Sequence, residues 1–211
     1  MADIITVEVF DEEGNIVSNP YETSVRSYAM NILANKEQPE AVKTVVVDML
    51  NYGAEAQKYF GYNTKDLANK KLTDAQKALA TDTVACENKQ VKGKNFYGTS
   101  LSLEDKIVLN MFFRNCKDGY TAKVSFTDYH GDVKTVEKEL TSYSGSIYKV
   151  AIDEIVLADA FSPVTVTVCD ADGNVHGTAT DSVESYVARN SGIDLNDAIM
   201  KFAYSAREYL R

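Results

Sequence analysis

The stretch Ile5-Thr-Val-Glu-Val-Phe-Asp-Glu-Glu-Gly-Asn-Ile16 returns late in the chain as Val164-Thr-Val-Thr-Val-Cys-Asp-Ala-Asp-Gly-Asn-Val175. In both stretches β-branched residues alternate with a period of two, which is typical of a half-buried strand. Each run ends in an acidic Gly-Asn pair, which supplies the positive φ angles of a tight hairpin turn. Both stretches therefore predict a β-hairpin. In the first hairpin, the residues that define the pattern are Ile5, Val7, Val9, Gly14 and Asn15.

The similarity continues beyond the two hairpins. Ser24-Val-Arg-Ser-Tyr28 matches Ser182-Val-Glu-Ser-Tyr186, and residues 49–60 match residues 199–210 in the placing of their apolar and small side chains. The order is the same in both copies: strand, turn, strand, short helix and long helix. Because chance matches rarely keep their order over this length, the pattern indicates an internal repeat of strand, hairpin, helix and helix.

The helices of the repeat have recognisable starting points. The first short helix is expected to begin near Thr23 or Ser24, and the second near Asp181, which has capping-box spacing to Glu184. The first long helix is expected to begin around Pro39, a favoured first-turn residue.

Small residues recur three apart in each long helix, Gly53 with Ala56 and Ala203 with Ala206. Small side chains at that spacing let two helices approach closely. We therefore expect helices near 40–60 and 194–210 to pack together. The alternative is that each helix covers its own sheet.

Residues 61–100 are polar and are expected to be irregular apart from one short helix, because Thr73 and Gln76 form a capping box ahead of 75–80. Residues 101–180 predict successive strands separated by turn signals at intervals typical of a sandwich. The segment 103–113 is interpreted as a strand, with a helix as the alternative. The six expected strands are Leu103–Phe113, Ala122–Asp128, Val133–Leu140, Ile147–Ile152, Val164–Asp170 and Val175–Thr180.

These elements predict an α+β fold with a central Ig-like antiparallel β-sandwich flanked by N- and C-terminal helical pairs. The expected divisions are an N-terminal β-hairpin (1–18), a helical segment with a polar linker (19–100), the Ig-like β domain (101–180) and a C-terminal helical pair (181–211) that packs on the N-terminal helices.

Composition and motif content argue against several classes of function. The 211 residues carry a formal net charge of −9, and such a surface repels phosphate backbones, so nucleic-acid binding is not expected. No apolar run is long enough to insert into a membrane, and the N-terminus has no pattern of a secretory signal peptide. The spacing of the three cysteines matches no zinc or redox motif, so no cofactor and no metal are expected.

Catalytic signatures are weak. The two histidines lie in or beside predicted turns, and nothing places a nucleophile next to either, so an enzyme is not expected. Asp170-Ala-Asp-Gly-Asn174 superficially suggests a calcium site, but it does not place a glycine and a glutamate where an EF-hand loop has them.

Exposed tyrosines could form a ligand or partner surface in the β domain, because aromatic rings provide platforms for glycans. The candidates for this surface are Tyr120, Tyr129, Tyr143 and Tyr148.

Three stretches carry a resemblance: 48–69, Tyr97-Gly-Thr-Ser-Leu-Ser-Leu-Glu104 and Asp181-Ser-Val-Glu-Ser-Tyr-Val-Ala-Arg189. They resemble a repeat or accessory module of large secreted surface proteins of anaerobic Gram-positive gut bacteria, over most of the chain from about Val7 to Tyr209. The resemblance implies a structural, adhesive or spacing role at the cell surface, outside the cell, as part of a larger protein. It offers no functional residues, and a virion is the alternative location.

The leading hypothesis is a non-catalytic structural or interaction module for assembly or surface attachment. The N-terminal hairpin would expose unpaired edges unless it docks on the chain's own sheet or on a neighbouring copy, so a protein partner or self-association is expected. The alternative is a carbohydrate-binding accessory module that uses the tyrosines, with a glycan as its partner. An enzyme of unknown type ranks last.

Overall fold

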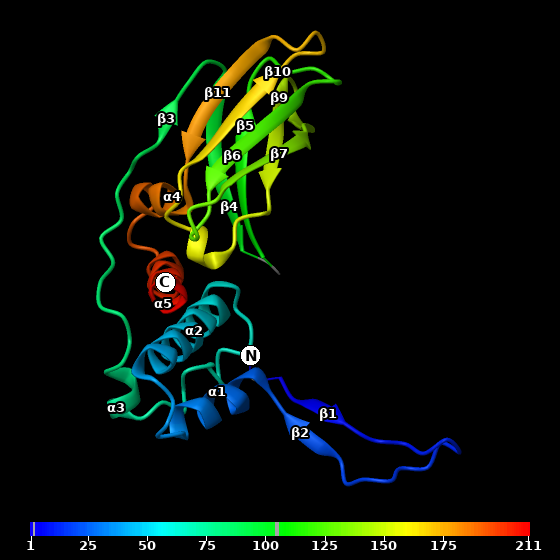
Figure 1. Cartoon of the computed structure of the whole chain (residues 1–211), viewed down its shortest axis with the longest axis vertical. Coiled ribbons are helices and arrows are strands. Elements are labelled where there is room, and N and C mark those ends of the chain that lie inside the picture. The colour runs from blue at the N-terminus through cyan, green and yellow to red at the C-terminus, as the bar shows by residue number, and fades with distance from the viewer. Residues whose placement is uncertain (2, 104–105) are drawn as a thin grey trace. The chain divides into compact units, whose positions relative to one another are not determined.

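A computed structural model describes residues 1, 3–103 and 106–211. The described chain is a mixed α and β protein with several antiparallel sheets and five α-helices, and it divides into two compact units, Met1–Asp82 and Thr83–Arg211. Figure 1 shows the elements of both units. Each unit is described by itself below, as unit 1 and unit 2.

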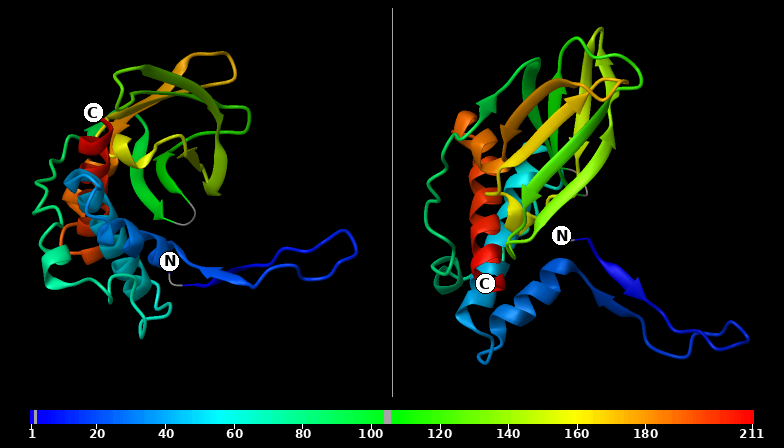
Figure 2. Two further views of the ribbon diagram at one scale, coloured as in Figure 1. Left: turned by 60° about the horizontal axis from the view of Figure 1, so that its bottom comes forward. Right: turned by 45° about the horizontal axis from the view of Figure 1, so that its top comes forward.

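Unit 1 combines a long β-ribbon with helices. Its strands are β1 (Ile5–Val7) and β2 (Tyr21–Thr23), which pair antiparallel. Its helices are α1 (Val25–Ala34), α2 (Glu40–Tyr59) and α3 (Asp74–Lys77). The ribbon projects away from the helices (Figure 2). The buried core of unit 1 consists of Ala29, Leu33, Val46, Val47, Leu50, Ala68 and Leu72.

Local capping fixes where the helices of unit 1 begin. The Ser24 side chain accepts the N–H of Ser27, so Ser24 caps α1, and Pro39 directly precedes α2. Thr73 and Gln76 form the expected capping box of α3. The expected helix starts in this unit are therefore confirmed.

Gly53 of α2 faces the N-terminus of the chain. A Cβ built at this position would lie 2.6 Å from the Met1 sulfur and 3.1 Å from the Ala68 Cβ. The small residue is thus explained by contacts inside unit 1. The expected packing of 40–60 against 194–210 stays a prediction, because these helices belong to different units.

Unit 2 contains two antiparallel sheets. One has five strands in the order β3-β11-β10-β6-β7, and the other has four in the order β4-β5-β9-β8. The strand bounds are β3 (Val91–Lys92), β4 (Phe96–Leu103), β5 (Ile107–Phe113), β6 (Thr121–Thr127), β7 (Val133–Glu139), β8 (Thr141–Ser144), β9 (Ile147–Ile152), β10 (Val164–Cys169) and β11 (Val175–Asp181).

The six expected strands are confirmed in β5, β6, β7, β9, β10 and β11, with boundaries shifted by a few residues. The segment 103–113 needs a correction at its start: Leu103 ends β4, and β5 begins at Ile107. The expectation that 61–100 is irregular was wrong for β3 and for the first residues of β4. The larger miss is β4. That strand has few large apolar residues, and its alternation is interrupted at Gly98, where the register with β5 shifts.

The core of unit 2 follows the period of two. Alternate residues of β5, β9 and β10 are fully buried, and both sheets curl around them as two layers (Figure 2). The completely buried strand residues are Leu109, Met111, Phe113, Val124, Val150, Ile152, Val164, Val166 and Val168.

Two helices and a 3₁₀ turn complete unit 2: η1 (Leu157–Asp159), α4 (Val183–Arg189) and α5 (Asp194–Leu210), which packs on η1 and α4. The expected cap at Asp181 was wrong, because Ser182 caps α4. The buried Asp181 carboxylate instead accepts hydrogen bonds from both terminal nitrogens of Arg189, at 3.1 and 2.6 Å.

The segment of residues 87–95, which ends in a turn at 94–95, runs beside β11 and the start of α4 and is here called the strap. Its β3 residues pair with Ala179 and Thr180. Close backbone approach requires glycine at Gly93 and Gly177: a Cβ at these positions would lie 2.1 Å from the Thr178 carbonyl oxygen and 2.7 Å from the Lys94 carbonyl oxygen, respectively.

Among the described helices, none is long and apolar enough to cross a membrane.

Replacement of Gly93 should loosen the strap. We expect Gly93→Ala to lower the free energy of unfolding of unit 2 by about 1–3 kcal/mol, because the added methyl group clashes with backbone that cannot move aside. Urea unfolding measures this change. The matched control is Gly98→Ala, whose Cβ meets no atom within 4 Å. Equal stability of the two variants would contradict the close approach.

Candidate functional site

The ribbon of unit 1, here called the arm (residues 4–23), has one apolar face. Pairing of Ile5 with Thr23 and of Val7 with Tyr21 places these residues on the same face, and Val17 donates to the Val9 carbonyl further along the ribbon. Ile5, Val7 and Val9 are 56%, 47% and 51% exposed. The predicted assembly residues therefore form an uncovered apolar strip.

Strand β10 of unit 2 has a similar sequence to the first strand of the arm, but its apolar side chains are buried. Val164, Val166 and Val168 stand at the places in the sequence pattern that match Ile5, Val7 and Val9, and all three are 0% exposed. In unit 2 the strand has neighbours on both sides, because β10 lies between β6 and β11. Among the residues that the structure describes, strand β1 has one neighbour, β2. The arm thus presents a strand face and strand edges that unit 2 covers with its own sheet.

Gly14 and Asn15 form the turn of the arm. Gly14 has φ +86°, and the Asp11 carboxylate accepts the Asn15 N–H at 2.8 Å. That hydrogen bond, followed by one from the Asn15 side-chain amide, holds the pKa of Asp11 below its ordinary value. The turn at Asp170 has the same bonds, with Asn174 N–H to Asp170 at 2.8 Å. In each turn the first Asp is engaged in holding the turn.

The arm is strongly acidic. It and the residue before it carry carboxylates and no Lys or Arg, since the first cationic side chain of the sequence is Arg26. These acidic residues are Asp3, Glu8, Asp11, Glu12, Glu13 and Glu22. All charged side chains of the arm are therefore negative.

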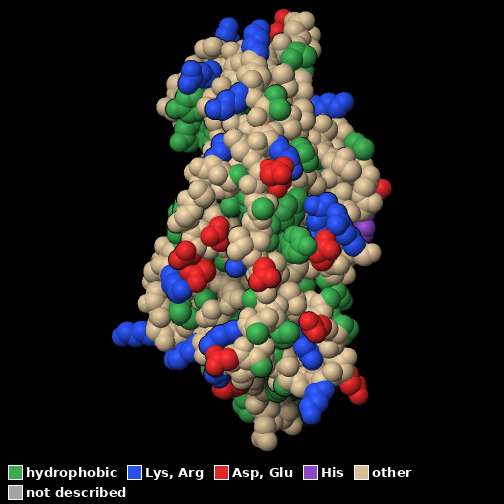
Figure 3. Space-filling view, turned by 90° about the vertical axis from the view of Figure 1, so that its left-hand side faces the viewer, with side chains coloured by type: hydrophobic (Ala, Val, Ile, Leu, Met, Phe, Trp, Pro, Cys, Tyr) green, Lys and Arg blue, Asp and Glu red, His purple; other side chains and the backbone are tan. Residues whose placement is uncertain are grey.

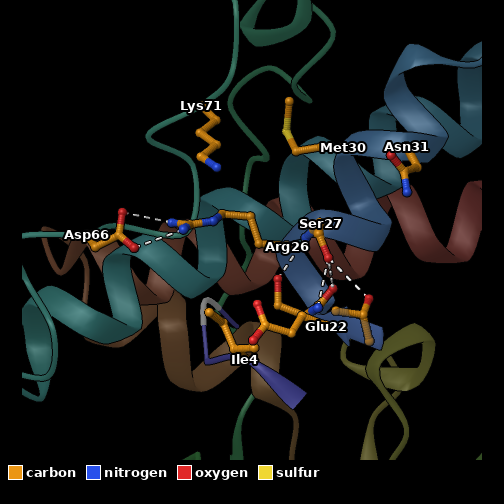
Figure 4. Close-up of a pocket in the computed structure, with 10 residues that line it drawn as sticks. Ile4, Glu22, Arg26, Ser27, Met30, Asn31, Asp66 and Lys71 are labelled. Atoms are coloured by element: carbon orange, nitrogen blue, oxygen red, sulfur yellow. Dashed lines mark hydrogen bonds and ion pairs between the residues drawn. The ribbon is translucent and has the colours of Figure 1, made fainter. Parts of the chain in front are cut away.

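A pocket of about 630 Å³ lies at the base of the arm, beside the first turn of α1 (Figure 4). Arg26 reaches across it to Asp66 with two hydrogen bonds of 2.9 and 2.8 Å. Lys71 lines the same pocket. Its full lining comprises Ile4, Glu22, Thr23, Ser24, Arg26, Ser27, Met30, Asn31, Asp66 and Lys71.

The four predicted tyrosines lie in different surroundings. Tyr148 is buried and donates its hydroxyl to Asp118 at 2.7 Å, while Tyr120 packs edge-on against the ring of His176. Tyr129 lies in a turn with its ring against His130. Tyr143 is 62% exposed and contacts Phe112. The structure therefore does not gather all four into one surface.

Tyr143 instead lines a second groove, of about 420 Å³, on the sheet β4-β5-β9-β8. Asn110 and Phe112 alternate with the core residues of β5, so they point to the opposite face of the sheet. Arg114 lies over the ring of Tyr97, 4.6 Å from its centroid. The groove is lined by Tyr97, Gly98, Thr99, Ser100, Ser102, Asn110, Phe112, Tyr143 and Lys149.

Sequence reasoning missed Tyr97, Asn110 and Phe112. The signal that could have found them is the polar Asn110 within the apolar run of β5, which marks a sheet face turned away from the core. Recognising the groove also required β4 as a strand beside β5. The base-of-arm pocket had no comparable signal, because its lining comes from the arm, α1 and the loop at 66–71.

The Cys116 thiol lies in the interior of unit 2. Burial raises the pKa of the Cys116 thiol to about 11, which disfavours the nucleophilic thiolate. In the part of the chain that the structure describes, no group of three or more His, Cys, Asp or Glu side chains is arranged to hold a metal ion.

On the face drawn in Figure 3, Lys and Arg side chains are interspersed with Asp and Glu.

Comparisons with protein-family models, curated proteins and solved structures found no match for this chain.

The Arg26–Asp66 pair should make unit 1 sensitive to acid. The Arg26 hydrogen bond holds the pKa of Asp66 below its ordinary 3.8, so the pair stabilises the fold above that pH and is lost as the pH falls through the folded-state pKa. We expect Asp66→Asn to be less stable than the wild type at pH 7, because Arg26 is 9% exposed and loses its counter-charge.

Urea unfolding of unit 1 across pH 2–7 tests this pair. The difference between wild type and Asp66→Asn should shrink as the pH falls below about 4. Asp74→Asn is the control, because its side chain is 99% exposed. A difference between wild type and Asp66→Asn that is independent of pH would contradict the assignment.

Proposed function

We propose that this chain is a non-catalytic assembly module that binds a neighbouring copy through its arm. The observation that carries the proposal is the exposed strip of Ile5, Val7 and Val9 on a ribbon with unpaired edges. Covering a half-exposed Val or Ile side chain contributes about 1 kcal/mol, and a strand edge gains backbone hydrogen bonds when it is paired. Assembly by strand addition supplies both.

We infer that the arm with α1 and α2, and β10–β11 with α4 and α5, are two copies of one ancestral unit. The support is the common order of elements together with matched local geometry. Gly14 and Gly173 have φ angles of +86° and +83° at equivalent turn positions. Ser24 and Ser182 cap the next helix in the same way, each accepting the N–H three residues later at 3.0 Å.

We further infer that the two sheets of unit 2 form an Ig-like sandwich. The support is their two-layer antiparallel arrangement with alternating buried residues. In this proposal unit 2 is a rigid spacer, and the arm supplies the contact between copies. A cell-surface, extracellular location within a larger protein, with a virion as the alternative, belongs to the proposal through the resemblance alone.

A second candidate function is carbohydrate binding in the groove of unit 2. The observation that favours it is the combination of exposed aromatic rings with polar side chains on one sheet face. Tyr97 and Tyr143 are 49% and 62% exposed, and Asn110 donates to Ser102 at 3.1 Å within the same groove. Aromatic faces beside hydrogen-bonding groups match the two kinds of surface that a sugar ring presents.

The assembly proposal predicts a face-specific effect of charge on the arm. We expect Val7→Lys to weaken self-association by at least about tenfold, because the ammonium group would have to be desolvated against an apolar surface. Multi-angle light scattering over a concentration series measures the effect. Thr6→Lys is the matched control, since it adds the same charge at the neighbouring position on the opposite face of the ribbon.

Wild-type protein that stays monomeric at all concentrations would overturn the assembly proposal. Equal weakening by Val7→Lys and Thr6→Lys would show a general charge effect and would also contradict it.

The carbohydrate proposal predicts dependence on an exposed ring. We expect a glycan array to identify an oligosaccharide ligand, and Tyr143→Ala to weaken its binding by roughly tenfold in calorimetry, through loss of ring contact. Tyr209→Ala is the control, because Tyr209 is 53% exposed but lies on α5 outside the groove. An array without ligands, or equal effects of the two substitutions, would remove this candidate.

A further inference from the structure

The strap of unit 2 shows how an extended segment binds at the start of a repeat helix. The Ser185 hydroxyl accepts the Lys89 N–H at 2.8 Å and donates to the Glu87 carbonyl at 3.3 Å. The Glu184 carboxylate accepts the Glu87 N–H at 3.3 Å. The strap then continues as β3, antiparallel to β11. Two side chains in the first turn of α4 thus hold the backbone of a passing strand.

Unit 1 has the same helix start without a strap. Ser24 has nearly the same backbone angles as Ser182, with φ −152° and ψ 162° against −147° and 167°. Ser27 occupies the place of Ser185. Its hydroxyl turns back on its own helix start, where it accepts the Ser24 N–H at 2.8 Å and donates to the Ser24 carbonyl at 2.9 Å. The hydroxyl that binds the strap in unit 2 therefore has local partners in unit 1.

The place that the strap would occupy is open in unit 1. The pocket of about 630 Å³ lies along Thr23, Ser24 and Ser27, the positions that match the strap-bearing residues of unit 2. Within the described part of the chain, β2 pairs with β1 alone, so its other edge corresponds to the edge of β11 that carries β3. Unit 1 thus has an edge of β2 beside an open pocket at the start of α1.

The charges around this site differ from those of unit 2. Arg26 stands where unit 2 has Glu184, whose carboxylate lies 3.7 Å from the strap residue Lys89. The loop beside the pocket adds Lys65, Lys70 and Lys71 and contains one carboxylate, Asp66. An acidic strand therefore fits unit 1 where a strand bearing Lys89 fits unit 2.

We propose that this site is filled by the arm of a second copy, with β2 of one copy antiparallel to β2 of the other. The inference rests on the assembly function proposed above and names the surface that receives the arm. Identical strands that pair antiparallel are related by a two-fold axis, so the contact is reciprocal and closes as a dimer.

In this arrangement the chain before β2 crosses the pocket of the partner copy in the direction that residues 87–90 take over α4. The residues of the arm that precede β2 carry its carboxylates past the first turn of α1, on the side where Asp66 and Lys71 line the pocket. The ladder between the copies is short, because β2 has three residues, and the strap of unit 2 is held by a comparable two-residue strand.

A charge exchange between arm and pocket tests the contact. Variant A carries Glu12→Lys and Glu13→Lys, and variant B carries Lys71→Glu. We expect each variant alone to dimerise roughly tenfold more weakly than wild type, because the symmetric dimer contains the altered contact twice. Mixing A with B restores opposite charges at both contacts, so the mixture should regain dimers of near wild-type affinity. Analytical ultracentrifugation at low salt measures all three samples.

The matched control for variant B is Lys36→Glu, which makes the same charge change beyond the far end of α1, about 15 Å away along the helix. It should dimerise like wild type. Dimers that Val7→Lys disrupts but the charge exchange leaves unchanged would preserve the assembly function and overturn the β2 site. Larger assemblies in place of dimers would overturn the two-fold arrangement. A monomeric wild type would remove the proposed function and this inference together.

Discussion

The fold depends on one requirement, that an apolar strand face and unpaired backbone edges must be covered. Unit 2 meets it within its own sheet, where β10 has a strand on each side and Val164, Val166 and Val168 are fully buried. The arm of unit 1 has a similar strand pattern without the surrounding sheet. Two similar strand sequences thus differ in burial: one is about half exposed in unit 1, and the other is fully buried in unit 2.

The two units show which features depend on neighbouring residues and which depend on partners far away in the sequence. Turn and helix cap are set by neighbouring residues, and they form in both units: the Asp11 and Asp170 turns have nearly identical hydrogen bonds. Burial is set by long-range partners, and it differs between the units: Val7 is 47% exposed and Val166 is fully buried. In the proposed assembly, β2 of the partner copy supplies to β2 what the strap supplies to β11.

Prediction from sequence succeeded where the determinants were local. The alternation of apolar residues located β6, β9 and β10, and Pro39 located the start of α2. It failed for β4, whose Ser, Thr and Gly residues hide its pairing with β5. It also misplaced the cap of α4, since Asp181 is engaged by Arg189 eight residues away. The residues of the arm were predictable, but the pocket at its base was not, because its lining joins residue 4 to residue 71.

The short ladder of the arm has a consequence for how far any strand pairing can propagate. Ile5 to Val7 pair with Tyr21 to Thr23, whereas Phe10 bridges Ile16, so the register shifts by two residues around Ser18 to Pro20. Pro20 also has no N–H to offer a neighbouring strand. Together with the carboxylates, this interruption leaves too little continuous edge for stacking of the cross-β type. The arm can therefore expose apolar residues in a concentrated solution and still resist growth into fibrils.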